Sequence, residues 1–571
     1  MNKRDTYEPQ KGDVIALTCM RPKCIDDLNR PPRNYLLAFV SRGDDEESLN
    51  LPQILTSKPL WREEDNEGEN DDKDGLEKWR PLYATFLINI TTNTRIWTAL
   101  TGGKNYNIVK AVLNADSNVQ DRCKDCSSQD IHVTGQNVLT NLHSLNLNAS
   151  QNNAVLRSVE TSLCNHKSSV ELIWGPPGTG KTKTVASLLW ILLKMKCRTL
   201  TCAPTNIAVV EVASRLHKLV KESNEHDGYG LGDIVLFGND KRMKIDDRKE
   251  LLDIFLKYRV DRLAECFVPL TGWRHQLNSM MSLLEDPKPQ YLMYLEDLKK
   301  KKKEGETGGR VKNTDSKGKK GKWKDQENCS KKKNLVESRK RKQKKSEGLV
   351  KSMILNGEGE TSDTVLTMWE FTRKRFDCIL WNLKYCVRIF CTHLSTSFLS
   401  KEVVGQMKKA LTLLQSMRTS LNNGNFGNNE LEKIFARSNK YQAATRSSTS
   451  ASLRGSIQEC LEVLKVLSKE FSVPNFFCRH MIGEFCLENA HLIFCTATSS
   501  AKLNEGKALE LLVIDEAAQL KECESTIPLQ LPWIRHAILI GDERQLPALV
   551  KSEVIFCILH FFSTLVFYSL L

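Results

Sequence analysis

Short, mostly apolar runs of four or five residues recur along this chain, and each is followed by glycine or by an acidic residue. Val170–Trp174, Leu511–Ile514 and Ala537–Ile540 are runs of this kind. Their length and lack of alternation predict strands that are buried on both faces of a parallel sheet. After the first run, Lys183–Lys196 places apolar residues on one helical face. The pattern predicts an α/β fold in which helices cover a parallel sheet.

Two other regions have patterns of their own. Gly12–Leu17, Tyr35–Val40 and Tyr83–Ile90 are short apolar runs separated by proline, glycine and charge, which predicts a β-rich domain resembling a small barrel. Further along, helical apolar spacing appears at Leu251–Tyr258 and again at Cys460–Leu467. These stretches predict helices that lie outside the sheet and whose default role is packing.

The first candidate binding motif is Gly175–Thr182, which lies between the first predicted strand and the predicted helix. Its sequence matches G-x-x-x-x-G-K-[ST]. Its glycines let several N–H groups face one point, and the helix dipole also favours a phosphate there. We expect Lys181 to reach the β- and γ-phosphates of ATP and Thr182 to ligate Mg²⁺. The alternative is a glycine turn without a ligand. The residues expected to bind the nucleotide here are Gly175, Pro176, Pro177, Gly178, Thr179, Gly180, Lys181, Thr182 and Lys183.

Two acidic residues, Asp515 and Glu516, follow the second apolar run directly. The C-terminal ends of parallel strands form the ligand edge of such a sheet. We expect Asp515 to hold Mg²⁺ opposite Thr182 and Glu516 to polarise the attacking water. An acidic pair that only caps the next helix is the alternative. Gly541-Asp542 follows the third run in the same position.

With these motifs, the chain resembles superfamily 1 helicases of the senataxin-like and Upf-one-like branch. The matching segments are G-P-P-G-T-G-K-T, A-P-T-N at Ala203–Asn206, D-E-A-A-Q at Asp515–Gln519 and G-D-x-x-Q-L-P at Gly541–Pro547. The resemblance implies a P-loop NTPase, RecA-like sheet with ATP and Mg²⁺ as cofactors. It also implies that Gln151 contacts the adenine and that Gln545 senses the γ-phosphate.

The same resemblance implies a nucleic-acid partner, single-stranded RNA or DNA. The residues expected to touch its backbone are Pro204, Thr205, Asn206 and Thr496. The alternative for both stretches is a strand-to-helix turn with polar caps. The resemblance also implies that the N-terminal barrel, which precedes the first motor domain in relatives, grips nucleic acid. It implies that the helical insertion helps to shape the nucleic-acid channel. A small barrel with no ligand is an equally weighted alternative for the N-terminal domain.

The net charge of the chain is concentrated in one segment, so it says little about the predicted folded domains. The 571 residues carry a net charge of +14, yet Lys299–Lys345 holds 21 Lys and Arg and 6 Asp and Glu, a net +15 that leaves −1 for the rest. This stretch cannot bury a core and is predicted to be disordered. We interpret it as a nuclear localisation signal that binds an import receptor, which predicts a nuclear protein; a non-specific nucleic-acid tether and a solvated insertion without a role are the alternatives.

The cysteines and the C-terminal segment are less informative. No apolar run follows Met1–Arg4, so we predict no signal peptide and mostly reduced thiols for the 18 cysteines. Cys123 and Cys126, with His132, Cys164 or His166, have the ligand types for zinc, but a plain loop with two thiols is favoured. Val554–Leu571 is free of charged residues and just long enough for a membrane anchor. We favour instead an aberrant terminus, because no second RecA-like domain fits in the 24 residues after Pro547.

These observations predict six segments along the chain. They are a β-rich barrel-like domain at 1–102, a connector at 103–146, the first part of the RecA-like domain at 147–220, a helical insertion at 221–490 with the disordered tract 299–345, the second part of the RecA-like domain at 491–552, and an apolar tail at 553–571.

The predicted function is that of an ATP-dependent RNA or RNA–DNA helicase involved in RNA processing, an NTP hydrolase by resemblance. Because the resemblance implies a second domain that supplies arginines to the transferring phosphate, we expect this chain to bind Mg-ATP but not to unwind alone. The alternative is a non-catalytic ATP-binding module for nucleic acid or protein. A P-loop ATPase with no nucleic acid is disfavoured by Gly541–Pro547.

Overall fold

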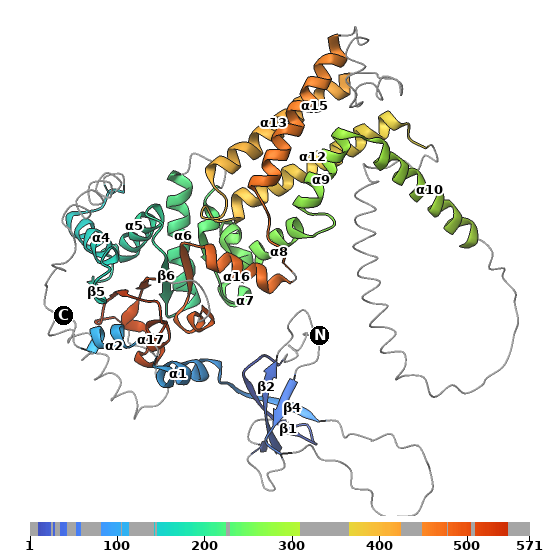
Figure 1. Cartoon of the computed structure of the whole chain (residues 1–571). Helices are drawn as coiled ribbons and strands as arrows, with labels where there is room; N and C mark the ends of the chain where they lie inside the picture. The colour runs from blue at the N-terminus through green and yellow to red at the C-terminus, as the bar shows by residue number, and fades with distance from the viewer. Residues whose placement is uncertain are drawn as a thin grey trace, which may run out of the picture. The chain divides into compact units, whose positions relative to one another are not determined.

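Figure 1 shows a computed structural model of the whole chain. The chain divides into two compact units. The structure describes residues 9–23, 27–28, 35–42, 53–58, 82–103, 105–113, 142, 145–223, 229–308, 365–423, 448–476, 478–503 and 509–545. The first unit comprises Met1–Ile191, Thr199–Val212 and Cys495–Leu571, and the second comprises Leu192–Arg198 and Ala213–Phe494.

The N-terminal part of the first unit is a four-stranded antiparallel sheet in the order β3-β2-β1-β4. Its strands are β1 (Asp13–Thr18), β2 (Tyr35–Arg42), β3 (Gln53–Thr56) and β4 (Tyr83–Asn89). One face buries a small core of Ile15, Leu17, Leu36, Ala38 and Val40. The three predicted strands are confirmed, whereas β3 was not predicted, because its four residues show no alternation. Closure into a barrel stays a prediction.

Two helices follow this sheet. Helix α1 (Thr91–Gly102) begins directly after β4 and ends at Gly103, which is left-handed with φ +47. Helix α2 (Tyr106–Leu113) starts after Asn105, whose side chain donates to the carbonyls of Leu531 and Ile534. The segment predicted as β-rich therefore ends in a helix. No residue of α1 is buried, so its sequence lacks the apolar stripe that would have predicted it.

The central sheet has six strands in the order β5-β10-β9-β6-β8-β7. They are β5 (Ser169–Trp174), β6 (Thr199–Ala203), β7 (Ile234–Leu236), β8 (Leu492–Thr496), β9 (Leu511–Ile514) and β10 (His536–Gly541). The predicted parallel α/β fold is confirmed. Strands β6, β8 and β9 are buried along their whole length, while β5 is only partly buried, which corrects the prediction that all were buried. The reason is topological, since β5 is at the edge of the described sheet.

In the first unit, helices accompany these strands. They are α4 (Ala149–Ser162), α5 (Lys181–Lys194), α6 (Asn206–Ser223) and α17 (Glu522–Leu529), with α5 and α6 continuing past the boundary of the unit. Helix α4 begins with a capping box in which Asn148 and Gln151 bond to each other's backbone N–H groups. This cap fixes Gln151 on the first turn of the helix.

Most of the second unit is helical. Its longer helices are α8 (Leu256–Phe267), α9 (Trp273–Glu285), α10 (Lys288–Gly308), α12 (Met368–His393), α13 (Lys401–Asn423), α15 (Ser448–Glu470) and α16 (Arg479–Asn489). All of these helices except α10 contribute to one hydrophobic cluster, in which Trp273 and Phe390 meet edge to face with ring centroids 5.6 Å apart. The helix predicted from Cys460–Leu467 is confirmed as part of α15. The stretch from Leu251 is instead a 3-10 turn that stops at the extended residue Phe255 before α8 begins.

Several predictions concern residues outside the described ranges. These are the Cys123–Cys126 pair with His132, the apolar tail at 553–571 and residues 309–345 of the basic tract. The first ten residues of that tract, Lys299–Gly308, form the end of α10 and are helical, which differs from the predicted disorder. Lysine is a good helix former, so α10 continues into the basic run. Among the described residues, no helix has the length and apolarity of a membrane span.

A buried polar cluster joins three distant parts of the second unit. Asp233, which directly precedes β7, accepts hydrogen bonds from the Ser395 hydroxyl at 2.5 Å and from the Thr396 backbone and hydroxyl, both at 2.8 Å. His491 Nδ1, just before β8, lies 3.2 Å from the same carboxylate. The start of β7, the loop after α12 and the start of β8 are thereby tied to one side chain.

Asp233 is more acidic than a free aspartate for this reason. Burial by itself would raise the pKa of Asp233, but the contacts with His491, Ser395 and Thr396 outweigh burial and lower it. A carboxyl whose pKa is lowered on folding stabilises the fold above its unfolded pKa, about 3.9, and loses that contribution as the pH falls through its folded pKa.

We predict that Asp233→Asn lowers the free energy of unfolding at pH 7 by about 1–3 kcal/mol, because a charged acceptor is lost from a buried network. The deficit should shrink as the pH falls from 7 to 3, because the carboxyl of the unfolded chain takes up a proton below about pH 3.9, whereas the folded carboxyl has a lowered pKa and stays charged to lower pH. Urea unfolding followed by circular dichroism measures both. Asp246→Asn, at an exposed carboxyl, is the control and should change stability little. A deficit that is the same at both pH values would contradict the prediction.

Candidate nucleotide-binding site

The register of the central sheet brings three loops to one edge. Trp174 at the end of β5 pairs with Gly541 at the end of β10, and Ile514 at the end of β9 pairs with Leu539. The ladder continues past the strands, since Gly175 N donates to Gly541 O at 3.3 Å and Asp515 N donates to Cys202 O at 2.9 Å. The predicted phosphate loop, the acidic pair and the third motif therefore start side by side.

The phosphate loop has the backbone that the motif predicts. Gly178 and Gly180 have φ of +78 and +85, in the left-handed region that glycine enters without strain. A Cβ at Gly180 would lie 2.7 Å from Gln151 Nε2, and one at Gly175 would lie 2.8 Å from Thr179 Oγ1. The backbone torsions of Gly178 and Gly180 therefore favour glycine, and a side chain at Gly175 or Gly180 would also have to displace Thr179 or Gln151. Helix α5 begins at Lys181, so its N-terminus faces the loop.

Lys181 and Gln151 both contact this loop. Lys181 Nζ donates to Gly175 O at 2.6 Å and to Pro176 O at 3.3 Å, so the ammonium lies across the loop. Gln151 Nε2 donates to Thr179 O at 3.0 Å. A cavity of about 510 Å³ opens beside them, and Gln151, Trp174 and Lys181 are among its lining residues. Its volume lies within the range of small-molecule sites.

The remaining predicted nucleotide-binding residues differ in their surroundings. Thr182 occupies the first turn of α5 with Lys183 after it. Lys183 Nζ donates to Asn146 O at 2.6 Å, a carbonyl that precedes α4. Pro176 and Pro177 form the stretch between β5 and the glycines, and the Thr179 hydroxyl donates to Pro176 O at 2.7 Å. A role for each in binding nucleotide stays a prediction.

Asp515 is buried at the end of β9, with 3% of its surface exposed. Burial raises the pKa of Asp515 to about 6; the charge of Glu516 adds to the rise, while the Glu516 N–H and the charge of Lys181 oppose it. Its Oδ1 is buried and has no hydrogen-bond partner among the described residues. An unpartnered carboxylate oxygen close to a lysine suits a hard divalent cation.

Glu516 has an unusual backbone. Its φ is +53, in the left-handed region, which costs a non-glycine residue about 1–2 kcal/mol. Gln519 Nε2 donates to Glu516 Oε2 at 3.0 Å and so fixes the carboxylate.

The third motif is stabilised by hydrogen bonds among its own residues and lies near the phosphate loop. Asp542 accepts from Gln545 Nε2 at 3.0 Å and from Arg544 N at 3.1 Å. The Arg544 guanidinium carbon lies 5.8 Å from the centre of the Trp174 ring, a cation–π contact to the last residue of β5. No pattern in the sequence predicts this contact. Leu546 and Pro547 lie outside the described residues.

The residues predicted to touch nucleic acid lie on two turns of the same unit. Pro204 and Thr205 link β6 to α6, which begins at Asn206, and Thr205 Oγ1 accepts from Ala208 N at 3.2 Å as a helix cap does. Thr496 ends β8, and its hydroxyl donates to Ser499 Oγ at 2.8 Å. The capping alternative therefore describes Thr205 as it stands, and nucleic-acid contact stays a prediction for all four residues.

Sequence reasoning also missed Arg95 of α1. Its Nη1 donates to Thr498 O at 2.9 Å, so the helix after the N-terminal sheet holds the turn that follows Thr496. The two residues are about 400 positions apart, and no pattern near Arg95 indicates the contact.

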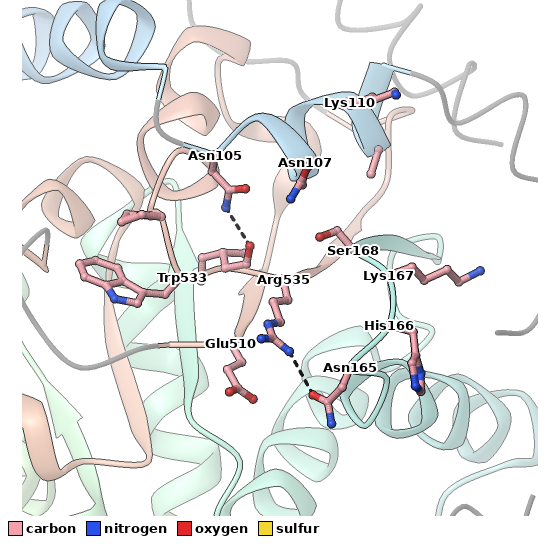
Figure 2. A pocket seen from close by; sticks show the side chains of 13 residues that line it. Asn105, Asn107, Lys110, Asn165, His166, Lys167, Ser168, Glu510, Trp533 and Arg535 are labelled. Atoms are coloured by element: carbon pink, nitrogen blue, oxygen red, sulfur yellow. Dashed lines mark hydrogen bonds between the residues drawn. The ribbon is translucent and has the colours of Figure 1, made fainter. Parts of the chain in front are cut away.

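A larger cavity, of about 860 Å³, lies at the other edge of the sheet (Figure 2). Ser168, Glu510 and Arg535, which directly precede β5, β9 and β10, are among its lining residues. Figure 2 shows Arg535 turned toward Asn165, to which its Nη1 donates at 3.2 Å. This cavity lacks the glycine loop and the acidic pair, so size alone does not identify the nucleotide site.

Comparison with known families agrees with this geometry. The AAA domain family matches residues 146–369 and 383–553, about two thirds of the chain. A domain of unknown function (DUF6469) matches residues 2–120, which contain the four-stranded sheet and both short helices after it.

Among curated relatives, the chain is 28% identical to helicase SEN1 of Saccharomyces cerevisiae over 170 residues, 25% of this chain and 7% of the relative. It is 42% identical to ATP-dependent helicase upf1 of Schizosaccharomyces pombe over 79 residues, 13% of this chain and 8% of the relative. It is 27% identical to probable helicase senataxin of Homo sapiens over 199 residues, 30% of this chain and 7% of the relative. The matched part thus spans less than a tenth of each relative's length.

We predict that Asp515→Asn stabilises the ligand-free protein. A carboxyl whose pKa is raised on folding, here to about 6, destabilises the fold as the pH rises from about 3.9 through that value. The variant should therefore gain about 1–3 kcal/mol of unfolding free energy at pH 8, about half of that gain at pH 5 and little at pH 4. Urea unfolding without nucleotide or Mg²⁺ measures the gain. A loss of stability at pH 8 would contradict the burial of an unpartnered charge.

Proposed function

Because this chain belongs to the AAA domain family and to the superfamily 1 helicases of the senataxin and Upf1-like branch, we propose that it binds Mg-ATP at Gly175–Thr182 and hydrolyses it when single-stranded nucleic acid binds. The observation that carries the proposal is the convergence of Lys181 and Asp515 at one sheet edge, close enough for the lysine to lower the pKa of the carboxyl. RNA is the first choice of nucleic acid, with RNA–DNA hybrids second.

Phosphate binding falls to the loop and the start of α5. The N–H groups around Gly178 and Gly180, together with the helix dipole, favour an anion at the point that the loop encloses. Lys181 donates at present to loop carbonyls. A phosphate offers the ammonium a charged acceptor in place of two neutral ones, so the side chain exchanges these bonds on binding.

The acidic pair divides the remaining work. Asp515, through its unpartnered buried oxygen, and Thr182 are the residues that would hold Mg²⁺. Mg²⁺, when bound, neutralises charge on the β- and γ-phosphates. Glu516, fixed by Gln519, orients the attacking water and accepts its proton. Gln545, fixed by Asp542, is the residue that responds to the γ-phosphate.

The wider role follows from the family and is proposed with it. Contacts at Pro204–Asn206 and Thr496 would bind the nucleic-acid strand to the loops that follow β6 and β8. RNA processing, a nuclear location and recognition of Lys299–Lys345 by an import receptor belong to the same proposal. Support for these comes from the family and from the charge of the tract.

The test is ATP hydrolysis by the purified chain with and without single-stranded RNA. We expect RNA to stimulate turnover and Lys181→Ala to lower it by about 100-fold or more, because a charged donor to the transferring phosphate is lost. Lys194→Ala, at the other end of α5, is the matched control and should keep wild-type turnover.

A chain that binds ATP but shows the same negligible turnover as Lys181→Ala would support a non-catalytic ATP-binding module instead. Turnover that Lys181→Ala leaves unchanged would remove the P-loop from the proposal altogether.

A further inference from the structure

Helix α12 exposes a large aromatic side chain in the second unit. Its inner face is buried through residues such as Leu380 and Leu383, each 2% exposed. Between them, Trp381 is 61% exposed. Tryptophan has the largest apolar side chain and is usually highly buried, so an indole held in solvent on a well-packed helix calls for an explanation.

The indole is held in place. The Trp381 and Tyr385 rings are stacked nearly parallel, at 9° with centroids 6.0 Å apart. The Tyr385 hydroxyl in turn donates a short hydrogen bond to Glu265 of α8. Because one helical turn separates the two rings and α8 anchors the second, Trp381 presents a flat ring whose orientation is set before any ligand arrives.

Arginines flank this aromatic row. The Arg388 guanidinium carbon lies 5.7 Å from the Tyr385 ring centre, one turn further along α12, and that of Arg262 lies 4.9 Å from the Tyr258 ring on α8. Arg262 and Glu265 are 3.8 Å apart, so Glu265 opposes one of the two cations. Arg388 extends the row with a positive charge.

The nearby carboxylates are engaged elsewhere. Asp377, one turn before Trp381, pairs with Arg418 at 2.6 Å, and Asp261 of α8 pairs with Arg479 at 2.7 Å. The row of Trp381, Tyr385 and Arg388, here called the α12 row, therefore combines stacked rings with net positive charge.

We propose that the α12 row binds single-stranded nucleic acid, with one base stacked on the Trp381 indole and a neighbouring phosphate on Arg388. Stacked aromatic rings beside arginine are what binding of an unpaired strand uses, because every base has a flat face and every linkage a negative charge. The choice of nucleic acid as ligand rests on the proposed function; the geometry of the row does not.

A protein partner fits the row less well. Interface residues that dominate binding sit in patches from which apolar neighbours exclude water. Around Trp381 the other solvent-accessible positions of α12 are instead polar or charged, such as the exposed Lys374 and the half-buried Asn382 and Lys384. An unpaired strand needs only a ring and a nearby cation.

The experiment measures binding of a fluorescein-labelled 20-nucleotide oligouridylate to the full chain by anisotropy, without ATP or Mg²⁺. Trp381→Ala should weaken binding about tenfold and Trp381→Phe, which keeps a ring, by much less. Arg388→Gln should reduce the slope of log affinity against log salt by about 0.7, the loss of one phosphate contact. Circular dichroism and the melting temperature check that each variant is folded.

Trp97→Ala is the matched control, because Trp97 of α1 is 70% exposed and tests whether any exposed indole would serve. We expect it to leave binding unchanged. Equal affinity of wild type and Trp381→Ala, an equal loss in Trp97→Ala, or no binding by the wild type would each overturn the α12 row as a binding surface.

The row and the proposed function fail separately. RNA-stimulated ATP hydrolysis with no effect of Trp381→Ala on binding would overturn the row alone. Trp381-dependent binding by a chain without ATP hydrolysis would leave the row in place and overturn the motor function.

Discussion

The candidate site depends on the parallel register of β5, β10 and β9. Trp174 pairs with Gly541, and Leu539 pairs with Ile514, so the loops after three strands start at one level. Strand pairing alone therefore makes neighbours of residues that are separated by more than 300 positions in the chain. A slip of the register by one residue would send Asp515 to the other face of the sheet and remove it from Lys181.

The same register imposes local costs on the fold. Asp515 is buried with an oxygen that has no hydrogen-bond partner in the described part of the chain, and Glu516 has a left-handed backbone. Neither feature improves packing, and each would be relieved by a neutral residue or a glycine. Strain and unsatisfied charge of this kind gather where function requires them. The fully buried strand β9, which leads into the turn and pairs with the fully buried β6, holds the turn in place.

The sequence predicted the chemistry of this site better than its surroundings. The glycine loop, the acidic pair and the flanking strands are local patterns, so each could be predicted from a few adjacent residues. Partial burial of β5 could not be, because it depends on which strand is at the edge. The contacts of Asp233 with Ser395 and His491, and of Arg95 with Thr498, join residues that are 162 to 403 positions apart, and no local pattern predicts them. Helix α1 was missed because none of its residues is buried.

The pairing of β7 with β8 has a consequence for how the chain could acquire so many helices. Ile234 pairs with Leu492, and Asp233 and His491 meet just before them, so the segment between returns to the point from which it left. The entropy of closing a loop grows only with the logarithm of its length, about 0.6 kcal/mol for each doubling. Because its two ends are held together by β7 and β8, such a segment can lengthen or shorten over evolution with little effect on the stability of the sheet that carries it.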